Sequence, residues 1–496
     1  MKFILSIDQG TTGTRAMVFN KNGEEISKDY IEHEQIFPKP GWVEHHPTEI
    51  WEKTKVVMKN ALTKAKISSE DIASIGIANQ RETVVAWNTL TGLPLHNAIV
   101  WQCRRTADLC SKLKNDGYSE LFTNKTGLVL DPYFSGTKIK WLLENSTKVQ
   151  SALQNGNLAV GTIDSWLIWN LTGRNITDYS NASRTLLFDI HKGVWDEELL
   201  ELLNIPLQIL PEVKPSSDKE TYGDVKEEII GTPIPVAGAA GDQQAALFGQ
   251  TCFEEGSIKN TYGTGNFMLL NTGKKPIKSE SGLLTTIAWK IGENIEYALE
   301  GSVFITGAAI QWLEEGISIL DDKSELERIM NEVPNTEGVF FVPAFVGLGA
   351  PHWDAYARGT IIGLTRGTTK DHIIRAAMES ICYQSEDIFE LMKNDSGIPI
   401  KVVRVDGGVT NTSSLLQFQS DISNVTIQKP VVSETTALGA AYLAGLAIDY
   451  WTSLDDISQN FQVEKEYNPS MNQNDRDLKL KTWKRALERS KNWSNV

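Results

Sequence analysis

The chain has 496 residues, too many for one hydrophobic core and enough for two or three domains. Its 41% hydrophobic and 22% charged residues are typical of a globular protein. The net charge of −15 gives no basic surface of the kind that binds nucleic acid, so we expect no nucleic-acid partner.

The amino terminus and the cysteines indicate a cytoplasmic protein. Asp8 interrupts the apolar run of "MKFILSIDQG", which is therefore a poor signal peptide. No stretch approaches the roughly 18 apolar residues of a membrane span. Four cysteines without a CxxC pair form no disulfide framework, which fits a reducing compartment. We expect a cytoplasmic protein with no membrane span.

The first predicted elements are a strand, a tight loop and a second strand, "KFILSID", "QGTTGT" and "RAMVFN". The glycines of this loop let successive amides converge on an anion, and the hydroxyl groups of Thr11 and Thr12 add donors. Arg15 would add a charge-assisted donor. Asp8 would repel a phosphate unless Mg²⁺ lay between them. Composition alone supports a plain hairpin turn equally well.

A predicted helix over residues 47–65 leads to a buried strand that carries two charges. The run "IGIANQRETVVAW" (75–87) places Arg81 and Glu82 side by side in apolar sequence. Neighbouring strand residues point to opposite faces, and unpaired buried charge is costly, so both residues need partners. A structural ion pair is the default explanation. We expect the strand to end or turn at this pair, so that both side chains reach one site.

The next segments supply aromatic residues. Trp101 ends an apolar run in "NAIVWQCRRT", and Tyr133 lies in a Pro-marked loop before a helix in "DPYFSGTKIKWLL". Aromatic side chains are more often core than ligand walls. Lys138 and Lys140 are expected on the surface of that helix. "EHH" (44–46) lacks metal-ligand spacing and is expected in a solvated loop.

In "AGDQQAALFG" (240–249), Asp242 and Gln243 stand between an apolar strand and a helix. The end of a strand that opens a helix is where an open α/β fold places a general base. A helix N-cap role for Asp242 fits the position equally well.

The pattern restarts around residues 250–256. "SIKNTYGTGNFMLLNTG" (257–273) is a second strand, Gly/Thr loop and strand, with Thr264 in the loop. In "VDGGVTN", Gly407 permits close approach of a nucleotide and Asn411 could bond it. Each motif alone is a turn, but together they describe a nucleotide held between two halves. Neither G-x-x-x-x-G-K-[ST] nor a strand followed by G-x-G-x-x-G occurs.

These elements predict an α/β fold of two domains with an interdomain cleft. We expect an N-terminal domain over residues 1–250 and a C-terminal domain over 251–445. A polar helical segment over 446–496 is expected to pack on the core.

Over nearly its whole length the chain resembles the FGGY carbohydrate kinases. The two signature patterns of that family correspond to "YFSGTKIKWLLEN" (133–145) and "GTIIGLTRGTTKDHIIRAAMES" (359–380). "NQRE", "WQCRRT" and "GDQQAALFGQ" resemble the members that phosphorylate glycerol. The resemblance implies a two-domain actin-like, ribonuclease H-type ATPase fold that closes on ATP and Mg²⁺.

The resemblance further implies ATP-dependent phosphorylation of glycerol to sn-glycerol 3-phosphate, the first step of glycerol catabolism. Asp242 matches the catalytic base of the family, and Asp8 would hold Mg²⁺. Glycerol contacts would fall on Arg81, Glu82, Trp101, Tyr133, Asp242, Gln243 and Phe267. Nucleotide contacts would fall on Thr11, Thr12, Gly13, Arg15, Thr264, Gly307, Gln311, Gly407 and Asn411. We expect a homodimer or higher homo-oligomer.

The sequence departs from the family pattern at three places. Gly13 and Thr14 stand where many members have two serines, and Asn266 stands beside the expected substrate wall where Cys or Ala is usual. "TYGDVKEEIIGTPIPV" (221–236) lacks the Gly/Lys-rich insertion with which bacterial members bind fructose 1,6-bisphosphate. Inhibition by that compound is therefore not expected.

Other functions fit parts of the pattern. One is a kinase for another polyol or a pentulose on the same fold. Another is an actin-like ATPase that forms filaments or acts as a chaperone, which would have no use for Arg81, Glu82 and Asp242 beside two aromatic residues. A catalytically silent polyol sensor is disfavoured because Asp8 and Asp242 are both present.

Overall fold

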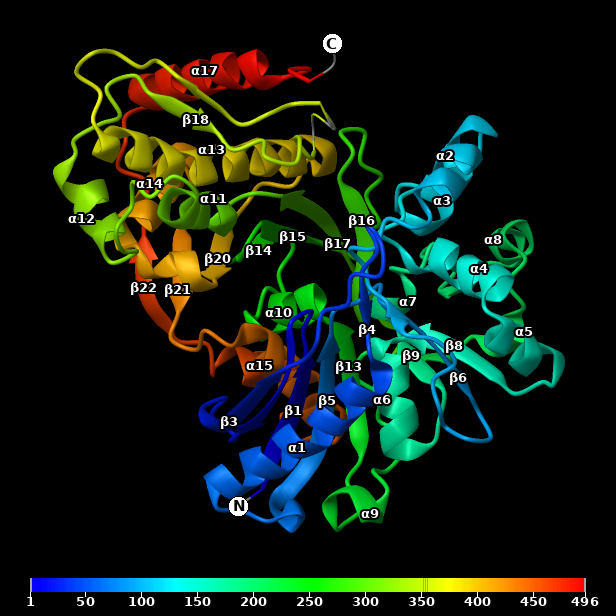
Figure 1. The fold of residues 1–496 in the computed structure, drawn as a ribbon. Coiled ribbons are helices and arrows are strands. Elements are labelled where there is room, and N and C mark those ends of the chain that lie inside the picture. Colours follow the sequence, from blue (N-terminus) through cyan, green and yellow to red (C-terminus); the bar gives the residue numbers. More distant parts are fainter. Residues whose placement is uncertain (1, 351, 353, 355, 495–496) are drawn as a thin grey trace.

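Two large β-sheets, one in each half of the chain, form the centre of the molecule (Figure 1). The computed structural model describes residues 2–350, 352, 354 and 356–494. The first sheet, ordered β13-β5-β1-β2-β3, consists of β1 (Phe3–Gln9), β2 (Gly13–Phe19), β3 (Glu25–Glu32), β5 (Ile72–Asn79) and β13 (Val236–Gly241). The second sheet, ordered β16-β17-β15-β14-β20-β21-β22, consists of β14 (Ser257–Tyr262), β15 (Asn266–Gly273), β16 (Leu284–Ile291), β17 (Asn294–Val303), β20 (Val402–Asp406), β21 (Ile427–Pro430) and β22 (Val463–Tyr467).

The two sheets share one plan. In the first, β1 and β2 form an antiparallel hairpin, β3 is antiparallel to β2, and β5 and β13 follow in parallel on the other side of β1. In the second, β14, β15, β17, β20 and β21 repeat this order and these directions. The predicted Gly/Thr loops are the turns of the β1–β2 and β14–β15 hairpins, so they occupy equivalent positions. The predicted α/β fold of two similar halves is confirmed.

A third sheet and a group of short helices extend the first half to the right in Figure 1. This sheet, ordered β4-β7-β6-β8, consists of β4 (Glu44–His45), β6 (Val84–Asn88), β7 (Ala98–Ile99) and β8 (Leu158–Thr162). Two-stranded sheets of the first half pair β9 (Ile176–Asp178) with β12 (Glu212–Lys214) and β10 (Phe188–Asp189) with β11 (Val194–Trp195). In the second half, β18 (Phe340–Val342) pairs with β19 (Thr360–Ile362). The helices of the first half are α1 (Pro47–Ala65), α2 (Ala107–Asn115), α3 (Ser119–Thr126), α4 (Ser135–Asn145), α5 (Thr147–Gln154), α6 (Ile163–Thr172), α7 (Tyr179–Ala182), α8 (Glu197–Leu203), α9 (Glu227–Ile230) and α10 (Asp242–Gly249).

Helices cover both faces of the first sheet. On β1, Leu5 and Ile7 point to the face that packs against α1, over the residues predicted to be helical. Ile4 points to the opposite face, which packs against α15 (Thr435–Ala447). This alternation is the one that a strand imposes on its side chains.

Helix α15 lies very close to the first sheet and to α10 because the contacting residues are small. A Cβ atom on Gly76 of β5 would lie 2.0 Å from the carbonyl oxygen of Ala440. A Cβ atom on Gly439 would lie 1.8 Å from the carbonyl oxygen of Ala245 in α10. Backbone atoms cannot move aside as a side chain can. A segment from late in the sequence therefore completes the core of the first half.

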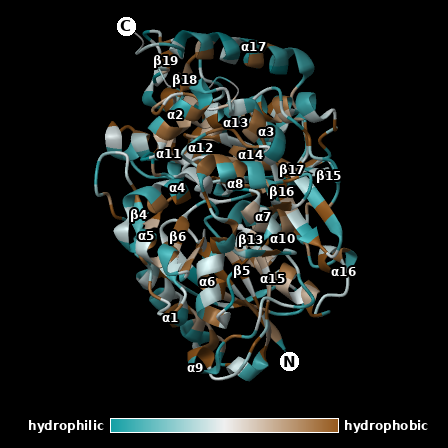
Figure 2. Cartoon of the chain, turned by 90° about the vertical axis from the view of Figure 1, so that its right-hand side faces the viewer, coloured by the Kyte–Doolittle hydropathy of each residue, from teal (hydrophilic) through white to brown (hydrophobic). Residues whose placement is uncertain are grey.

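The second sheet packs against the remaining helices and against the carboxyl-terminal segment. Beyond the predicted helix, this segment contributes β22, an edge strand antiparallel to β21. Trp483 and Leu487 anchor its last helix in the core, and the rest of that helix is largely hydrophilic (Figure 2). The helices on the second sheet are α11 (Gly307–Gln311), α12 (Glu325–Glu332), α13 (Lys370–Ser396), α14 (Ser413–Ser423) and α17 (Gln473–Ser490), whereas α16 (Leu454–Ser458) contributes Ile457 to the core that contains Ile4 of β1. Within the described part of the chain, no helix is both long enough and apolar enough to cross a membrane.

We expect Gly439→Ala to lower the free energy of unfolding by about 2 kcal/mol or more, because the new methyl group would overlap the backbone of α10. Thermal unfolding followed by circular dichroism measures the effect. Gly367→Ala is the matched control, since the atom nearest to its new Cβ is the Thr365 hydroxyl oxygen at 3.8 Å. Equal midpoints for the two variants would contradict the close packing of α10 and α15.

Candidate active site

The predicted acidic and basic residues meet at one edge of the first sheet. Gln9 pairs with Asn79, and Asn79 pairs with Gly241, so the parallel strands β1, β5 and β13 end side by side. The first hairpin loop, Arg81 and Asp242 follow directly after these three strand ends. In an open α/β sheet, the edge formed by the carboxyl ends of the strands is where ligands bind.

The first hairpin loop is tight and is held by neighbouring side chains. The Gly10 N–H donates to the carbonyl oxygen of Gly13 at 3.0 Å, and Trp101 Nε1 donates to the Thr11 hydroxyl at 2.9 Å. A Cβ atom on Gly13 would lie 2.5 Å from the ring of Tyr30, so the glycine lets this exposed ring pack closely on the loop. The neighbouring Thr12 hydroxyl lies 3.4 Å from the Tyr30 hydroxyl. The loop is thus packed from two sides.

Asp8 lies at the end of β1 with its side chain 15% exposed. Burial raises the pKa of this carboxyl to about 6, although Arg15, whose Nη1 lies 3.9 Å away, acts to lower it. The Arg15 guanidinium also forms an ion pair with Glu434, just before α15. The predicted phosphate donor therefore faces two carboxylates in this structure.

A single carboxylate such as Asp8 fits the way proteins bind Mg²⁺, which keeps waters and substrate phosphates as its other ligands. Among the described residues, no group of three or more His, Cys, Asp or Glu side chains could hold a metal ion.

The strand that carries Arg81 and Glu82 turns at this pair, as predicted. Strand β5 ends at Asn79, and β6 begins at Val84. Arg81 has φ +60°, a left-handed backbone conformation that is unusual for a residue with a side chain. The turn directs both side chains into one site, where Arg81 is 3% exposed and Glu82 1%.

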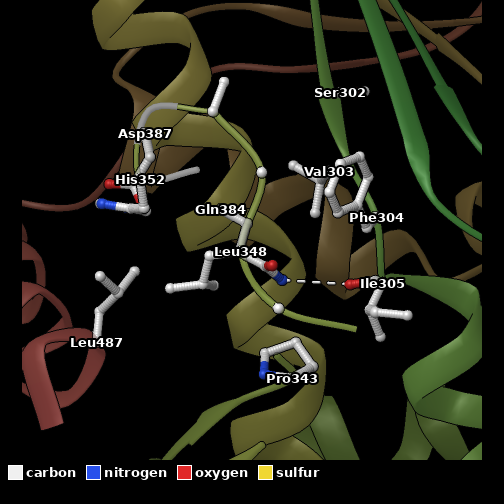
Figure 3. A pocket seen from close by; sticks show the side chains of 13 residues that line it. Ser302, Val303, Phe304, Ile305, Pro343, Leu348, His352, Gln384, Asp387 and Leu487 are labelled. Carbon is white, nitrogen blue, oxygen red and sulfur yellow. Dashed lines mark hydrogen bonds between the residues drawn. The ribbon is translucent and has the colours of Figure 1, made fainter. Parts of the chain in front are cut away.

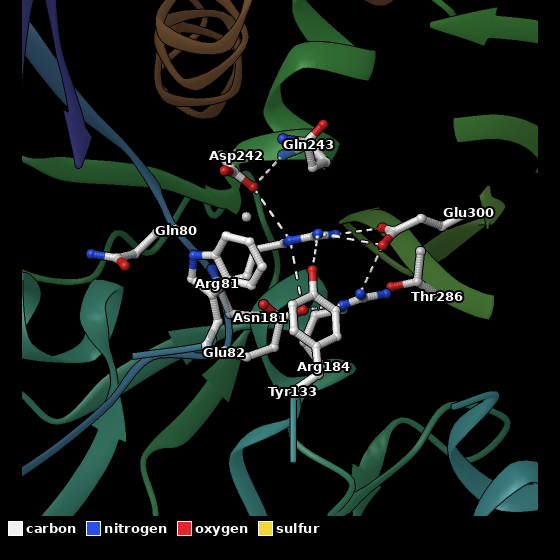
Figure 4. A network of polar contacts seen from close by, with 12 residues as sticks. Gln80, Arg81, Glu82, Tyr133, Asn181, Arg184, Asp242, Gln243, Thr286 and Glu300 are labelled. Carbon is white, nitrogen blue, oxygen red and sulfur yellow. Dashed lines mark hydrogen bonds and ion pairs between the residues drawn. The ribbon is translucent and has the colours of Figure 1, made fainter. Parts of the chain in front are cut away.

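The Arg81 guanidinium lies at the centre of a polar network (Figure 4). Its Nη2 donates to the Tyr133 hydroxyl at 2.8 Å, and both Nη atoms donate to Glu300 of β17. Its Nε lies 3.3 Å from Asp242 Oδ1 and 3.7 Å from Glu82 Oε1. One buried cation thus connects the predicted base to the second sheet.

A second buried arginine completes this network. Arg184 Nε donates to Glu82 Oε1 at 2.8 Å, and its Nη2 donates to Glu300 Oε1 at 2.9 Å. Burial acts to raise the pKa of Glu300, but the guanidinium groups of Arg184 and Arg81 outweigh it and hold that pKa at about 2. Glu82 Oε2 is buried with no hydrogen-bond partner among the described residues. This oxygen is an uncommitted acceptor inside the network.

Asp242 is the first residue of α10, and Gly241 is the cap, so the N-cap alternative does not hold. Asp242 Oδ1 accepts from the Gln243 N–H at 2.7 Å and faces Arg81. The side chain is 26% exposed. Burial raises the pKa of the Asp242 carboxyl, while Arg81 acts to lower it. A carboxylate with these neighbours can accept a proton from a bound hydroxyl group.

The predicted aromatic residues lie next to this network. The rings of Trp101 and Tyr133 meet edge to face with centroids 5.4 Å apart. Phe267 stands on β15, and its carbonyl oxygen accepts from Lys259 Nζ at 3.0 Å. Lys259 also donates to the Gln243 side chain, so it connects α10 to the second hairpin.

The predicted nucleotide residues of the second half come together around the β14–β15 turn. The Gly307 N–H donates to the Gly263 carbonyl oxygen at 3.1 Å, which places the start of α11 against Thr264. Gln311, at the end of α11, donates to Glu315 at 2.8 Å. A second neighbour of the turn is Gly407, where a Cβ atom would lie 2.2 Å from the carbonyl oxygen of Tyr262. Asn411 is an exposed residue at the end of the short helical turn that follows β20.

A cavity lies beside these residues and not on them (Figure 3). Phe304, Ile305, Leu348, Gln384 and Asp387 are among its lining residues. None of the thirteen lining residues belongs to the predicted site.

The structure corrects two predictions about lysine and histidine positions. Lys138 is buried and donates to the carbonyl oxygens of Tyr133 at 2.6 Å and Glu82 at 3.3 Å, and burial lowers its pKa to about 7. The surface prediction for Lys138 was wrong because the turn that carries Glu82 covers this side of α4, so the ammonium group is buried against backbone carbonyl oxygens. The "EHH" segment is no solvated loop, since Glu44 and His45 form the buried strand β4.

Asn266 is buried at the start of β15. Its Nδ2 donates to the Ser385 hydroxyl of α13 at 3.0 Å. Because neighbouring residues of a strand point to opposite faces, Asn266 and Phe267 cannot line the same wall. Likewise, the Thr14 hydroxyl is buried and donates to the Gln9 side chain, so it does not face a ligand.

Three residues of the site were missed in the sequence, namely Arg184, Lys259 and Glu300. Glu300 is a single charge in the largely apolar run "ALEGSVF" (298–304), which is the kind of signal that identified Arg81 and Glu82, whereas Arg184 and Lys259 stand among polar residues. A lone charge in an apolar run indicates that it needs a buried partner but not which residue that partner is.

The duplicated sheets, the two equivalent hairpin loops and the carboxylates at the strand ends define a two-domain kinase with an actin-like ATPase fold. Residues 3–249 match the N-terminal domain of the FGGY family of carbohydrate kinases, and residues 258–448 match its C-terminal domain. The chain belongs to the FGGY family of carbohydrate kinases.

Several relatives are similar over the full length. Glycerol kinase 2 of Thermotoga maritima is 57% identical, and glycerol kinase 1 of Clostridium tetani is 56% identical, each with 99% of both chains covered. The crystal structure of Plasmodium falciparum glycerol kinase with ADP is 40% identical, with a TM-score of 0.94 over 99% of this chain and 98% of that one. A ligand-bound xylulose kinase from Lactobacillus acidophilus, 23% identical, shares the fold with a TM-score of 0.85 over 99% and 97%.

We expect Asp8→Asn to raise the thermal midpoint of the ligand-free protein at pH 7.5. The folded-state pKa of about 6 lies above the ordinary 3.8, so folding becomes less favourable as pH rises between these values. Removing the charge should recover on the order of 1–3 kcal/mol near neutral pH and nothing below about pH 4. The facing charges are Arg15, Asp242 and Glu434. Unfolding measured from pH 4 to 8 tests this, and a gain at pH 4 equal to that at pH 7.5 would contradict it.

Proposed function

We propose that this kinase transfers the γ-phosphoryl group of ATP to glycerol and forms sn-glycerol 3-phosphate, the first step of glycerol catabolism. The observation that carries the proposal is the joint presence of Arg81, Glu82 and Asp242 at one strand edge. Relatives 54–57% identical over at least 98% of the chain are named glycerol kinases.

The polar atoms left uncommitted at this edge match a small triol. Glu82 Oε2 is a buried acceptor without a partner in the described part of the chain. Asp242 engages Arg81 and the Gln243 N–H through Oδ1, which leaves Oδ2 for a hydroxyl group. Trp101 and Phe267 would cover the carbon face of glycerol, with Tyr133 and Gln243 beside them.

On the nucleotide side, Thr11, Thr12 and Gly13 would hold the phosphates, and Arg15 would reach them by leaving one of its carboxylates. Thr264, Gly307, Gln311, Gly407 and Asn411 would bind the rest of ATP across the second half. Mg²⁺ would accompany the phosphates at Asp8 and spread the negative charge of the transferred group.

In the reaction, the terminal hydroxyl oxygen of glycerol would attack the γ-phosphorus of ATP while Asp242 accepts the hydroxyl proton. The bond from the γ-phosphorus to the β,γ-bridging oxygen would break, and ADP would leave. Phosphoryl transfer needs little covalent work from the protein, so the rate depends on positioning and on charge stabilisation. Arg81, fixed by Tyr133 and Glu300, would hold the acceptor close to Asp242. Exclusion of water between the two halves would suppress hydrolysis of ATP.

We also propose the arrangement expected from the sequence. Residues 1–250 and 251–445 would act as two domains with the substrates in a cleft between them, and residues 446–496 would pack on the core. The protein would work in the cytoplasm as a homodimer or higher homo-oligomer, without inhibition by fructose 1,6-bisphosphate.

An ADP-release assay with MgATP tests the substrate. Release should depend on an added acceptor, and glycerol should give a larger kcat/KM than dihydroxyacetone, ribitol or xylulose. Preference for a pentulose would overturn the assignment of glycerol. Acceptor-independent release or formation of filaments would favour the ATPase alternative.

Asp242→Asn should lower kcat by roughly 10³-fold or more, because the amide cannot accept the hydroxyl proton. The Kd for MgATP should stay within about threefold, since the base does not bind the nucleotide. Asp108→Asn, an exposed acid in the first turn of α2, is the matched control and should keep full activity. Near-normal turnover of the Asp242 variant would remove it as the base.

A further inference from the structure

Two buried charged residues outside the predicted contact set hold the substrate residues. Glu300 stands on β17 of the second sheet, and Arg184 follows α7 in the first half. We infer that Glu300 and Arg184 are positioning residues, which orient Arg81 and Glu82 so that the kinase discriminates acceptors by the number and place of their hydroxyl groups. This inference deepens the proposed function and rests on it.

The Glu300 carboxylate is fixed through both oxygens. Oε2 accepts from Arg81 Nη1, and Oε1 accepts from Arg81 Nη2 at 3.3 Å and from Arg184 Nη2 at 2.9 Å. Glu300 is 2% exposed, so water cannot replace these contacts. A planar guanidinium bound at both terminal nitrogens has a fixed orientation. Glu300 therefore determines where the Arg81 fork points.

Arg184 fixes the orientation of the Glu82 carboxylate, as Glu300 fixes the orientation of the Arg81 guanidinium. Its Nε donates to Glu82 Oε1 at 2.8 Å, which commits that oxygen and leaves Oε2 as the acceptor. Arg184 is fully buried, and its ring contacts include Phe134, at 5.4 Å from the guanidinium carbon. The side chain is thus held by packing as well as by charge. Glu82 cannot rotate without breaking this contact.

Without the Glu300 charge, the two buried guanidinium groups would share Glu82 as their one fully buried carboxylate, with the partly exposed Asp242 beside Arg81. Two guanidinium groups, Arg81 and Arg184, face two buried carboxylates, Glu82 and Glu300 (Figure 4). Without the Glu300 carboxylate, Arg81 would turn its fork toward Asp242, whose Oδ1 already lies 3.3 Å from Nε. The N–H groups of Arg81 would then point away from the hydroxyl groups of the substrate that accepts the phosphoryl group. Glu300 thus competes with Asp242 for Arg81.

Discrimination by hydroxyl groups is the property that such fixed polar atoms produce. A site built to hydrogen-bond a hydroxyl rejects an analogue that lacks it by up to roughly 10⁴-fold, because its buried polar groups are left unpaired. If the polar side chains of the site are free to rotate, they can form other hydrogen bonds when the hydroxyl group is missing. The free-energy cost of binding the analogue is then smaller. Loosening the network should therefore reduce the preference for glycerol over its deoxy analogues.

The test compares glycerol with propane-1,2-diol and propane-1,3-diol as acceptors for wild type and Glu300→Gln at saturating MgATP. We expect kcat/KM for glycerol to fall on the order of 100-fold, mainly through KM for glycerol. KM for MgATP should stay within about twofold. The preference for glycerol over each diol should fall at least about tenfold.

Conservative variants separate positioning from fold stability. Glu300→Asp keeps the charge and should recover part of the preference, whereas Arg184→Lys cannot bridge two carboxylates and should lose it. Glu296→Gln removes a half-buried carboxylate four residues earlier on β17 and is the matched control, with wild-type preference.

An unchanged preference in the Glu300→Gln variant would overturn the inference, even if its activity or thermal midpoint falls. If that variant does not fold, wild-type preference in both Glu300→Asp and Arg184→Lys would overturn it equally. Failure of the wild-type protein to phosphorylate glycerol is a different result, since it rejects the proposed function before any variant is compared.

Discussion

The organising constraint of this molecule is the burial of the Arg81 guanidinium. A cation that is 3% exposed must have anionic partners, and its partners come from three separate elements: Glu82 beside it, Asp242 at the start of α10 and Glu300 on the second sheet. Buried ion pairs of this kind contribute little net stability compared with apolar packing, because desolvation of the charges offsets their attraction. Their effect is geometric. They bring one residue from each sheet to a common point.

The duplicated fold explains why such a meeting point exists. Each half ends its first hairpin in a Gly/Thr turn, and the strands next to each hairpin run parallel, so their carboxyl ends converge beside the turn. Asp8, Arg81 and Asp242 lie at this edge of the first sheet. Gly407 lies at the equivalent edge of the second sheet. Helix α15 then joins the halves, since it follows Glu434, the partner of Arg15, and packs on the first sheet.

The sequence predicted local features well and contacts between distant residues poorly. The helix over 47–65, the two hairpins and the turn at Arg81 follow from periodicity, glycine placement and the cost of buried charge. Lys138 was misplaced because helix periodicity gives a face but not its neighbours, and its acceptors are backbone carbonyls brought in by a turn. The motifs gave the candidate site, but they could not show that Arg184 and Glu300 lie behind it.

The same network is the reason to expect a phosphoryl acceptor other than water. An ATPase that uses water needs one activated water near the phosphate and gains nothing from a second buried carboxylate. Here Glu82 Oε2 is buried beside Arg81 with no partner in the described part of the chain. Leaving such an atom unpaired carries a desolvation cost on the order of 1–3 kcal/mol, which a bound hydroxyl group would remove. Under the proposed function, a hydroxyl group of the acceptor would hydrogen-bond Glu82 Oε2 and extend the polar network that joins the two sheets.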